Sequence, residues 1–126
     1  MLSNRKFYPT IPAADLDRAA KWYDEKLGLK PTKQELLGYT YEFGSGSGFL
    51  LYPTANAGQA PNTLATFSSS DVQADVEALR ARGVVFEDYD FPGLKTENGI
   101  AAMGDDRYAA WFKDSEGNIL AIGNDQ

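Results

Sequence analysis

The sequence has 126 residues, a net charge of −6, and neither histidine nor cysteine. The length predicts one domain, the absence of cysteine excludes disulfides and thiol chemistry, and the negative charge disfavours nucleic acid as a partner. No apolar run approaches the roughly 20 residues that a membrane helix needs, and the first ten residues lack the apolar run of a secretory signal. We therefore expect a cytoplasmic protein with no membrane partner. Its negative charge either serves only to keep a small protein soluble or attracts a cationic ligand.

The first half of the sequence predicts a strand, a helix and two further strands. After a short strand that begins near Tyr8, Asp15 is a typical helix N-cap, because its side-chain oxygen can accept hydrogen bonds from the free backbone N–H groups of the first turn. Apolar residues then recur at helical spacing until Gly28, a typical helix stop. Residues 39–43 and 49–52 predict two strands, joined by the turn GSGSG.

The second half of the sequence repeats this pattern. A strand from Leu64 precedes a second N-cap, Asp71, and the helix that follows ends at Gly83. Further strands are predicted at residues 84–86, 99–103, 107–112 and 119–123, with the tight turn KDSEGN before the last of them. Two copies of one unit predict an α+β fold of two βαβββ modules, at about residues 5–54 and 62–124, within a single domain. We expect the mixed sheet to curl around a central cup.

A long polar segment, residues 87–99, separates two predicted strands of the second half. Loops longer than about 12 residues in compact domains are often lids or binding loops. Pro92 and Gly93 would turn the segment, which would bring Phe91 and Leu94 over the mouth of the cup. The alternative is that the segment contains a short irregular strand.

Three stretches carry a resemblance to a known family: IPAADLDRAAKWYDEKLGL, DVQADVEALRARGV and AAWFKDSEGNILAI. Together they resemble the vicinal oxygen chelate superfamily, which includes glyoxalase I, the extradiol dioxygenases and the bleomycin resistance proteins. The resemblance covers nearly the whole chain, and FKDSEGN at residues 112–118 is its most specific part. It implies the cupped two-module fold and leaves the activity open, because this fold hosts many chemistries.

The resemblance also implies where a metal-dependent member would place its ligands. These positions fall on Tyr8, Leu64, Ala121 and either Phe49 or Leu51. Transition metals in such sites need imidazole, thiolate or carboxylate donors, and this set offers only a phenol. We therefore predict no metal and no cofactor.

A cup without metal ligands predicts a pocket for an organic molecule. Strand alternation puts Tyr8 with Thr10, and Leu64 with Thr66, on the faces expected to line the cup, and the small Ala121 leaves room there. The alternative is that these side chains fill the cup as core. The full set of predicted ligand-binding residues is Tyr8, Thr10, Phe49, Leu51, Leu64, Thr66, Met103, Trp111 and Ala121.

Two functions remain open from the sequence. The first is a metal-independent protein, similar to the bleomycin resistance proteins, that binds a small organic molecule of cationic character without chemistry. The second is a metal-free enzyme of lyase or isomerase type, with Glu42 or Tyr8 as acid or base; Glu42 could fill this role inside the cup but not on a solvated face. A filled cup would instead indicate an interaction module. By resemblance, we expect a homodimer with ligand pockets between the subunits.

Overall fold

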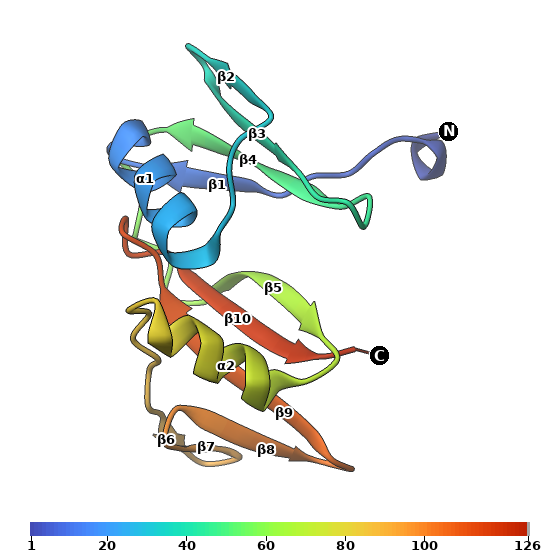
Figure 1. Cartoon of the computed structure of the whole chain (residues 1–126), viewed down its shortest axis with the longest axis vertical. Coiled ribbons are helices and arrows are strands. Elements are labelled where there is room, and N and C mark those ends of the chain that lie inside the picture. The colour runs from blue at the N-terminus through green and yellow to red at the C-terminus, as the bar shows by residue number, and fades with distance from the viewer. Residues whose placement is uncertain (126) are drawn as a thin grey trace.

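The computed structural model describes residues 1–125, which form two sheets with one helix beside each (Figure 1). The first half contains η1 (Leu2–Asn4), β1 (Thr10–Ala13), α1 (Leu16–Leu27), β2 (Lys33–Glu35), β3 (Gly38–Glu42) and β4 (Gly48–Pro53). The second half contains β5 (Thr63–Ser69), α2 (Val72–Ala81), β6 (Asp90–Phe91), β7 (Leu94–Glu97), β8 (Ile100–Gly104), β9 (Arg107–Lys113) and β10 (Ile119–Asn124).

The two sheets share one topology. The first has the strand order β1-β4-β3-β2, and the second has the order β5-β10-β9-β8-β7-β6. In each sheet the first strand runs parallel to the last strand of its half, β1 with β4 and β5 with β10, and the other neighbours are antiparallel. The predicted α+β fold is therefore confirmed, with mixed sheets that are not closed into a barrel.

Both helices begin at the predicted caps. The side chain of Asp15 accepts a hydrogen bond from the backbone N–H of Arg18 at 3.0 Å, and Asp71 accepts one from Ala74 at 3.1 Å. Gly28 ends α1 in the left-handed conformation, with φ at 69°, where a residue with a Cβ would be strained. The local signals in the sequence thus fix where both helices start and where α1 stops.

Three segments differ from the sequence-based expectation. The sequence does not predict β2, because its residues KQE are exposed and show no apolar alternation. Residues 84–86 make a single bridge, from Phe86 to Phe112, rather than a strand. Residues 87–99 fold as the β6–β7 hairpin, with Pro92 and Gly93 in its turn, so the alternative of a short irregular strand is the correct one.

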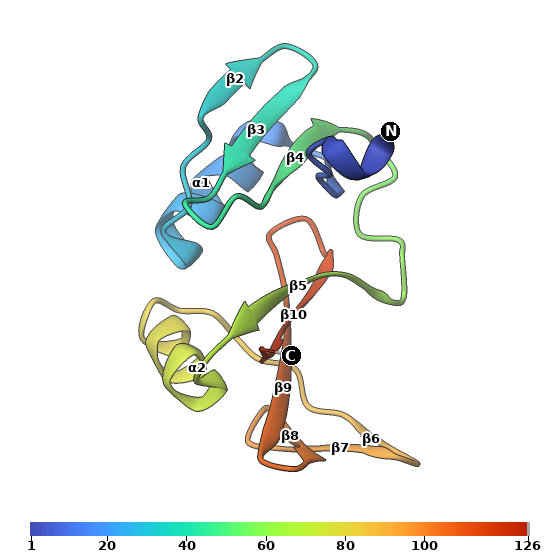
Figure 2. The same cartoon turned by 90° about the vertical axis from the view of Figure 1, so that its right-hand side faces the viewer.

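The helices lie against one face of the two sheets (Figures 1 and 2). Aromatic residues pack between helix α1 and the sheets. Tyr23 of α1 packs on Tyr41 and Phe49, with ring centroids 6.0 and 5.3 Å away, and all three residues are buried. Trp22 of α1 stacks on Phe112 of the second sheet at 6.2 Å, so Phe112 packs beneath a helix. Helix α1 therefore contacts both halves of the chain.

Candidate functional site

A cavity of about 670 Å³ lies between β1 and β5. Within residues 1–125, each of these strands pairs on one side only, β1 with β4 and β5 with β10, so the cavity follows the seam between two sheet edges. Figure 2 shows the two sheets on either side of this seam. Its walls come chiefly from the residues before and in β1, the turn into β4, and β5.

Aromatic rings form much of the cavity wall. Among the described lining residues, five are aromatic: Phe7, Tyr23, Phe43, Phe49 and Phe67. Phe49 lies 5.3 Å from Tyr23 and 6.0 Å from Phe43, measured between ring centroids, and Phe43 stacks on Phe67 at 6.3 Å. Because Phe43 follows β3 and Phe67 lies on β5, this aromatic wall runs from the first half of the chain into the second.

The polar side chains that line the cavity are small hydroxyls and one carboxylate. The hydroxyls of Ser45 and Ser47 lie 2.9 Å apart, and the hydroxyl of Ser68 donates a hydrogen bond to the carboxylate of Asp125. Thr66 adds a further hydroxyl group. A mostly apolar cavity with a few placed polar groups is typical of a site for a small organic molecule.

Tyr23 is not available for acid–base chemistry in this cavity. Its hydroxyl donates to Asp114 Oδ2 at 2.6 Å. Burial, and after it the negative charge of Asp114, raises the pKa of Tyr23 well above its ordinary value. The phenol therefore stays protonated at neutral pH and contributes an apolar ring surface rather than a base.

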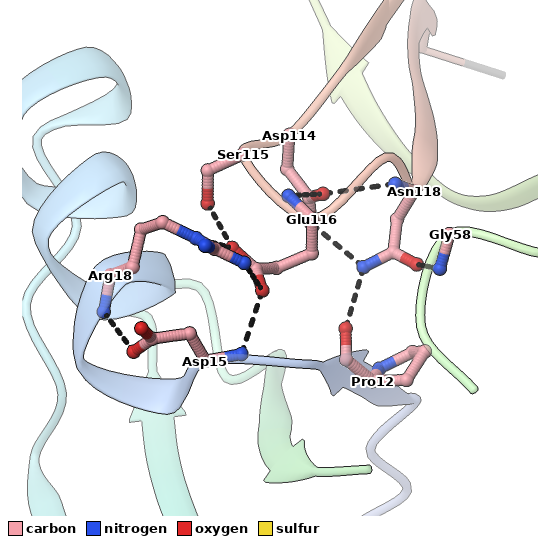
Figure 3. A network of polar contacts seen from close by, with 8 residues as sticks. All are labelled: Pro12, Asp15, Arg18, Gly58, Asp114, Ser115, Glu116 and Asn118. Carbon is pink, nitrogen blue, oxygen red and sulfur yellow. Dashed lines mark hydrogen bonds and ion pairs between the residues drawn. The ribbon is translucent and has the colours of Figure 1, made fainter. Parts of the chain in front are cut away.

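The turn between β9 and β10 fixes how the two halves meet (Figure 3). Asn118 Nδ2 donates to the backbone carbonyl of Pro12 in β1 at 2.7 Å, and Asn118 Oδ1 accepts from the backbone N–H of Gly58 at 3.2 Å. Asp114 keeps the turn closed, because its Oδ1 accepts the backbone N–H groups of Glu116 and Asn118, each at 2.9 Å. One buried asparagine thus joins the second half to β1 and to the segment between the halves.

Glu116 extends the same contact to the start of α1. Its carboxylate accepts from Nε and Nη2 of Arg18, both at 2.9 Å, and from the backbone N–H of Asp15 at 2.9 Å. The Glu116 side chain is fully buried, whereas 55% of the Arg18 side chain is exposed. The hydrogen bonds from Arg18 outweigh the effect of burial and lower the pKa of Glu116 to about 2. The carboxylate is therefore charged at neutral pH and holds α1 against the second sheet.

Three of the nine residues predicted to bind a ligand line this cavity: Phe49, Leu64 and Thr66. Ala121 and Trp111 lie beside Thr66 in register, across β5, β10 and β9, so these three side chains form a row on the sheet face that the helices do not cover. Whether Ala121 and Trp111 contact a ligand stays a prediction.

The register of β4 determines which of the predicted residues share a face of the first sheet. Thr10 pairs with Leu50, so Leu50 shares the face of Thr10. Phe49 and Leu51 point to the opposite face and are buried in the core, with 6% and 0% of their surface exposed. The sequence could not choose between these faces, because FLLY is apolar at every position. Met103 lies near the end of β8 with 53% of its surface exposed.

Both candidate acid–base residues lie outside the cavity lining. Glu42 is on the face of β3 opposite the buried Tyr41, and 40% of its side chain is exposed. Its carboxylate lies 3.8 Å from Lys6 Nζ and accepts from the hydroxyl of Thr32 at 3.4 Å. Tyr8 precedes β1 and is half-buried. Glu42 therefore has the surroundings of an ordinary surface carboxylate.

The residues at the positions implied for metal ligands do not fit a metal ion. Tyr8, Leu64 and Ala121 supply one phenol and two hydrocarbon side chains, and the sequence contains no histidine or cysteine. Among residues 1–125, no three His, Cys, Asp or Glu side chains converge on one point. A zinc-type centre needs three or four such donors, so the described part of the chain, residues 1–125, offers no ligand set for one.

The cavity lining includes residues that sequence reasoning missed. Phe43 and Phe67 form an aromatic contact between the two halves, and Ser68 and Asp125 supply a polar pair. Their strand positions alone do not predict this role. The sequence feature that could have located the cavity is the internal repeat, because β1 and β5 are the matching first strands of the two units and both remain edge strands.

Comparison with known protein families identifies the fold. The sequence profile of the Glyoxalase/Bleomycin resistance protein/Dioxygenase superfamily matches residues 7–122. The chain belongs to this superfamily. Among curated proteins, none matches the sequence.

Solved structures of this superfamily's fold are similar along nearly the whole chain. UcmS2 is 19% identical, with a TM-score of 0.70, over 94% of this chain and 96% of that one. TnmS3, an antibiotic binding protein from Streptomyces sp. CB03234, is 18% identical, with a TM-score of 0.67, over 100% and 99%. Lactoylglutathione lyase from Agrobacterium tumefaciens is 18% identical, with a TM-score of 0.65, over 96% and 93%. At these identities the similarity establishes the fold alone.

The helices carry no membrane-spanning signal. Within residues 1–125, neither helix is long and apolar enough to cross a bilayer. Helix α1 has 12 residues and α2 has 10, whereas a spanning helix needs roughly 20.

Proposed function

We propose that this protein binds a small organic molecule, without a metal, in the cavity between β1 and β5. The observation that carries this proposal is the cavity itself: about 670 Å³, walled by aromatic rings from both halves and lined by only a few polar groups. Sites for drug-sized ligands have volumes of about 300–1,000 Å³ and the same mixture of apolar walls and sparse polar groups. The cavity is thus of the right size and chemistry for an organic ligand.

Binding without turnover is favoured over catalysis by the groups near the cavity. Burial, and after it the charge of Asp114, keeps the Tyr23 phenol neutral, and Glu42 is outside the lining and lies beside Lys6. A general base must reach the proton that it removes, within about 3 Å or through one water. Among similar structures, TnmS3 is described as an antibiotic binding protein, which supports a binding role, whereas the lactoylglutathione lyase supports the fold only.

We also propose that the protein acts as a homodimer. The face of the first sheet that the helices do not cover carries exposed Leu50 and Tyr52, with 36% and 37% of their surface exposed. A second copy placed against this face would cover apolar surface and could bring Thr10, Trp111 and Ala121 into a shared site. Size-exclusion chromatography with light scattering tests this, and a monomer at micromolar concentration would contradict it.

Native mass spectrometry tests the binding proposal directly. The protein is purified without added metal, and its mass is measured before and after addition of divalent metals. We expect a mass free of metal, with adducts of small organic molecules from the expression host that are lost on denaturation. Stoichiometric metal binding would overturn the metal-independent site.

A cavity-filling variant locates the site. Ala65 lines the cavity, whereas Ala102 lies exposed on β8. We expect Ala65→Trp to abolish the organic adduct and Ala102→Trp to retain it, because only the first adds bulk inside the cavity. Both variants are checked for cooperative unfolding, and an adduct that survives in Ala65→Trp would place the ligand elsewhere.

A further inference from the structure

We infer that the cavity selects a ligand in which a positively charged amine is joined to a flat aromatic body. This inference rests on the proposed function, because it concerns the same cavity. It is carried by three observations: one carboxylate in the lining, an aromatic wall beside it, and a volume that exceeds that of an amine group alone.

Asp125 is the charged group of the cavity. Among the described lining residues, it is the only one with an ionisable acidic or basic side chain other than the neutral phenol of Tyr23. The hydroxyl of Ser68 donates to its carboxylate, and the backbone N–H of Asp125 donates to the carbonyl of Ser69 at 2.8 Å, so the residue is held beside β5. None of the ion pairs formed within residues 1–125 involves Asp125. A cation in the cavity would therefore meet a single negative charge.

The aromatic wall favours the same sign of charge. The faces of aromatic rings carry partial negative charge and attract ammonium and guanidinium groups within about 6 Å of the ring centre. Phe43, Phe49 and Phe67 line the cavity as one connected series, in which Phe43 stacks on Phe67 and meets Phe49 edge-on, and Tyr23 continues the series. An anion would find neither a cationic side chain nor a helix N-terminus among the described lining residues.

The shape of the wall indicates the rest of the ligand. Phe43 and Phe67 stack with an interplanar angle of 28° across the seam between the halves. Flat rings prefer offset stacking or edge contacts on such surfaces. A cavity of about 670 Å³ has room for a fused-ring body as well as its amine. The preferred class is therefore an aromatic amine that is protonated at neutral pH.

A matched pair of probes tests this class. The first is 1-naphthylmethylamine, which is protonated at pH 7, and the second is 1-naphthalenemethanol, its neutral analogue of similar shape. Isothermal titration calorimetry measures the dissociation constant of each at low and high ionic strength. We expect the amine to bind about fivefold more tightly at low salt, because an exposed ion pair and a cation–π contact each contribute modestly. The preference should shrink as salt screens the carboxylate.

Two charge-removing variants assign the effect. We expect Asp125→Asn to reduce the preference for the amine to about twofold while the neutral probe binds as before, since asparagine can still accept from Ser68. Unchanged binding of the neutral probe also reports that the variant is folded. The control is Asp90→Asn, on the exposed β6–β7 hairpin outside the lining, which should leave both affinities unchanged.

The outcomes separate the inference from the proposed function. Equal affinity of the wild-type protein for the two probes, or a preference that stays near fivefold in Asp125→Asn, would overturn the inference and leave small-molecule binding intact. Failure of both probes to bind at millimolar concentration would count against the cavity as the binding site, and so against the proposed function. Loss of both probes in Ala65→Trp together with loss of the preference in Asp125→Asn would support both.

Discussion

The strongest test of the packing between the two halves is removal of the charge on Glu116. Its buried carboxylate accepts a two-pronged pair of hydrogen bonds from Arg18 and a third from the backbone of Asp15. In Glu116→Gln the carboxamide keeps the shape and one acceptor oxygen, but its NH₂ group would face a donor of Arg18. The substitution therefore removes the charge and leaves a buried mismatch at the contact between α1 and the second sheet.

The pKa of Glu116 gives the size of the effect. Because the pKa falls from 4.5 to about 2 on folding, the group stabilises the folded state by about 3 kcal/mol at pH 7. The folded-state pKa is the lower of the two, so this contribution is complete above about pH 5 and is lost as the pH falls towards 2. At pH 3 less than half of it should remain.

Urea unfolding at several pH values measures this directly. We expect Glu116→Gln to lower the free energy of unfolding by about 2–3 kcal/mol at pH 7 and by clearly less at pH 3, at one fixed protein concentration. The control is Glu77→Gln on the exposed face of α2, which should change stability by less than about 0.5 kcal/mol at either pH. A loss in Glu116→Gln that is equally large at pH 7 and pH 3 would refute the electrostatic reasoning.

Two further substitutions test local packing. Gly48→Ala should destabilise the protein by more than about 2 kcal/mol, because the added Cβ would lie 2.1 Å from the carbonyl oxygen of Tyr41. The control is Gly44→Ala, which has open space around it and should have little effect. Similar unfolding midpoints for the two variants would contradict the β3–β4 geometry. Tyr23→Phe should cost about 1–2 kcal/mol in urea unfolding, since it takes one hydrogen bond from the buried carboxylate of Asp114, and an unchanged stability would mean that this bond adds nothing.

Local signals in the sequence were enough for the helices and most strands. Asp15, Asp71 and Gly28 act through side chains and backbone groups within four residues of themselves, so their roles could be read without knowing the fold. The exposed strand β2 carries no such signal, and it forms because β3 offers it a paired edge. The same is true of the β6–β7 hairpin, whose base is held by bonds between Tyr89 and Thr96.

The candidate site was harder to predict because it is made by contacts between distant parts of the chain. Alternation along β5 predicted only Leu64 and Thr66, whereas residues 64–68 all line the cavity because it follows the seam at the edge of this strand. The position of that seam depends on bonds such as Asn118 to Pro12, 106 residues apart, and Arg18 to Glu116, 98 residues apart. No periodic pattern in the sequence encodes which two sheet edges these bonds bring together.

The bonds between the halves and the cavity are parts of one arrangement. Ile11 lines the cavity while the next residue, Pro12, is held by Asn118, and the Tyr23 ring lines the cavity while its hydroxyl is held by Asp114. A ligand in the seam contacts both halves at once, so it binds only when they are docked, and at 100 times its dissociation constant it would add about 2.7 kcal/mol to stability. A variant that loosens the docking of the halves, such as Glu116→Gln, should weaken the apparent affinity for the ligand. The fractional loss of affinity should equal the fraction of molecules in which the halves are undocked. Ligand affinity and the stability of the contact between the halves should therefore fall together as the pH falls from about 5 towards 2, the range in which the stabilisation by Glu116 is lost.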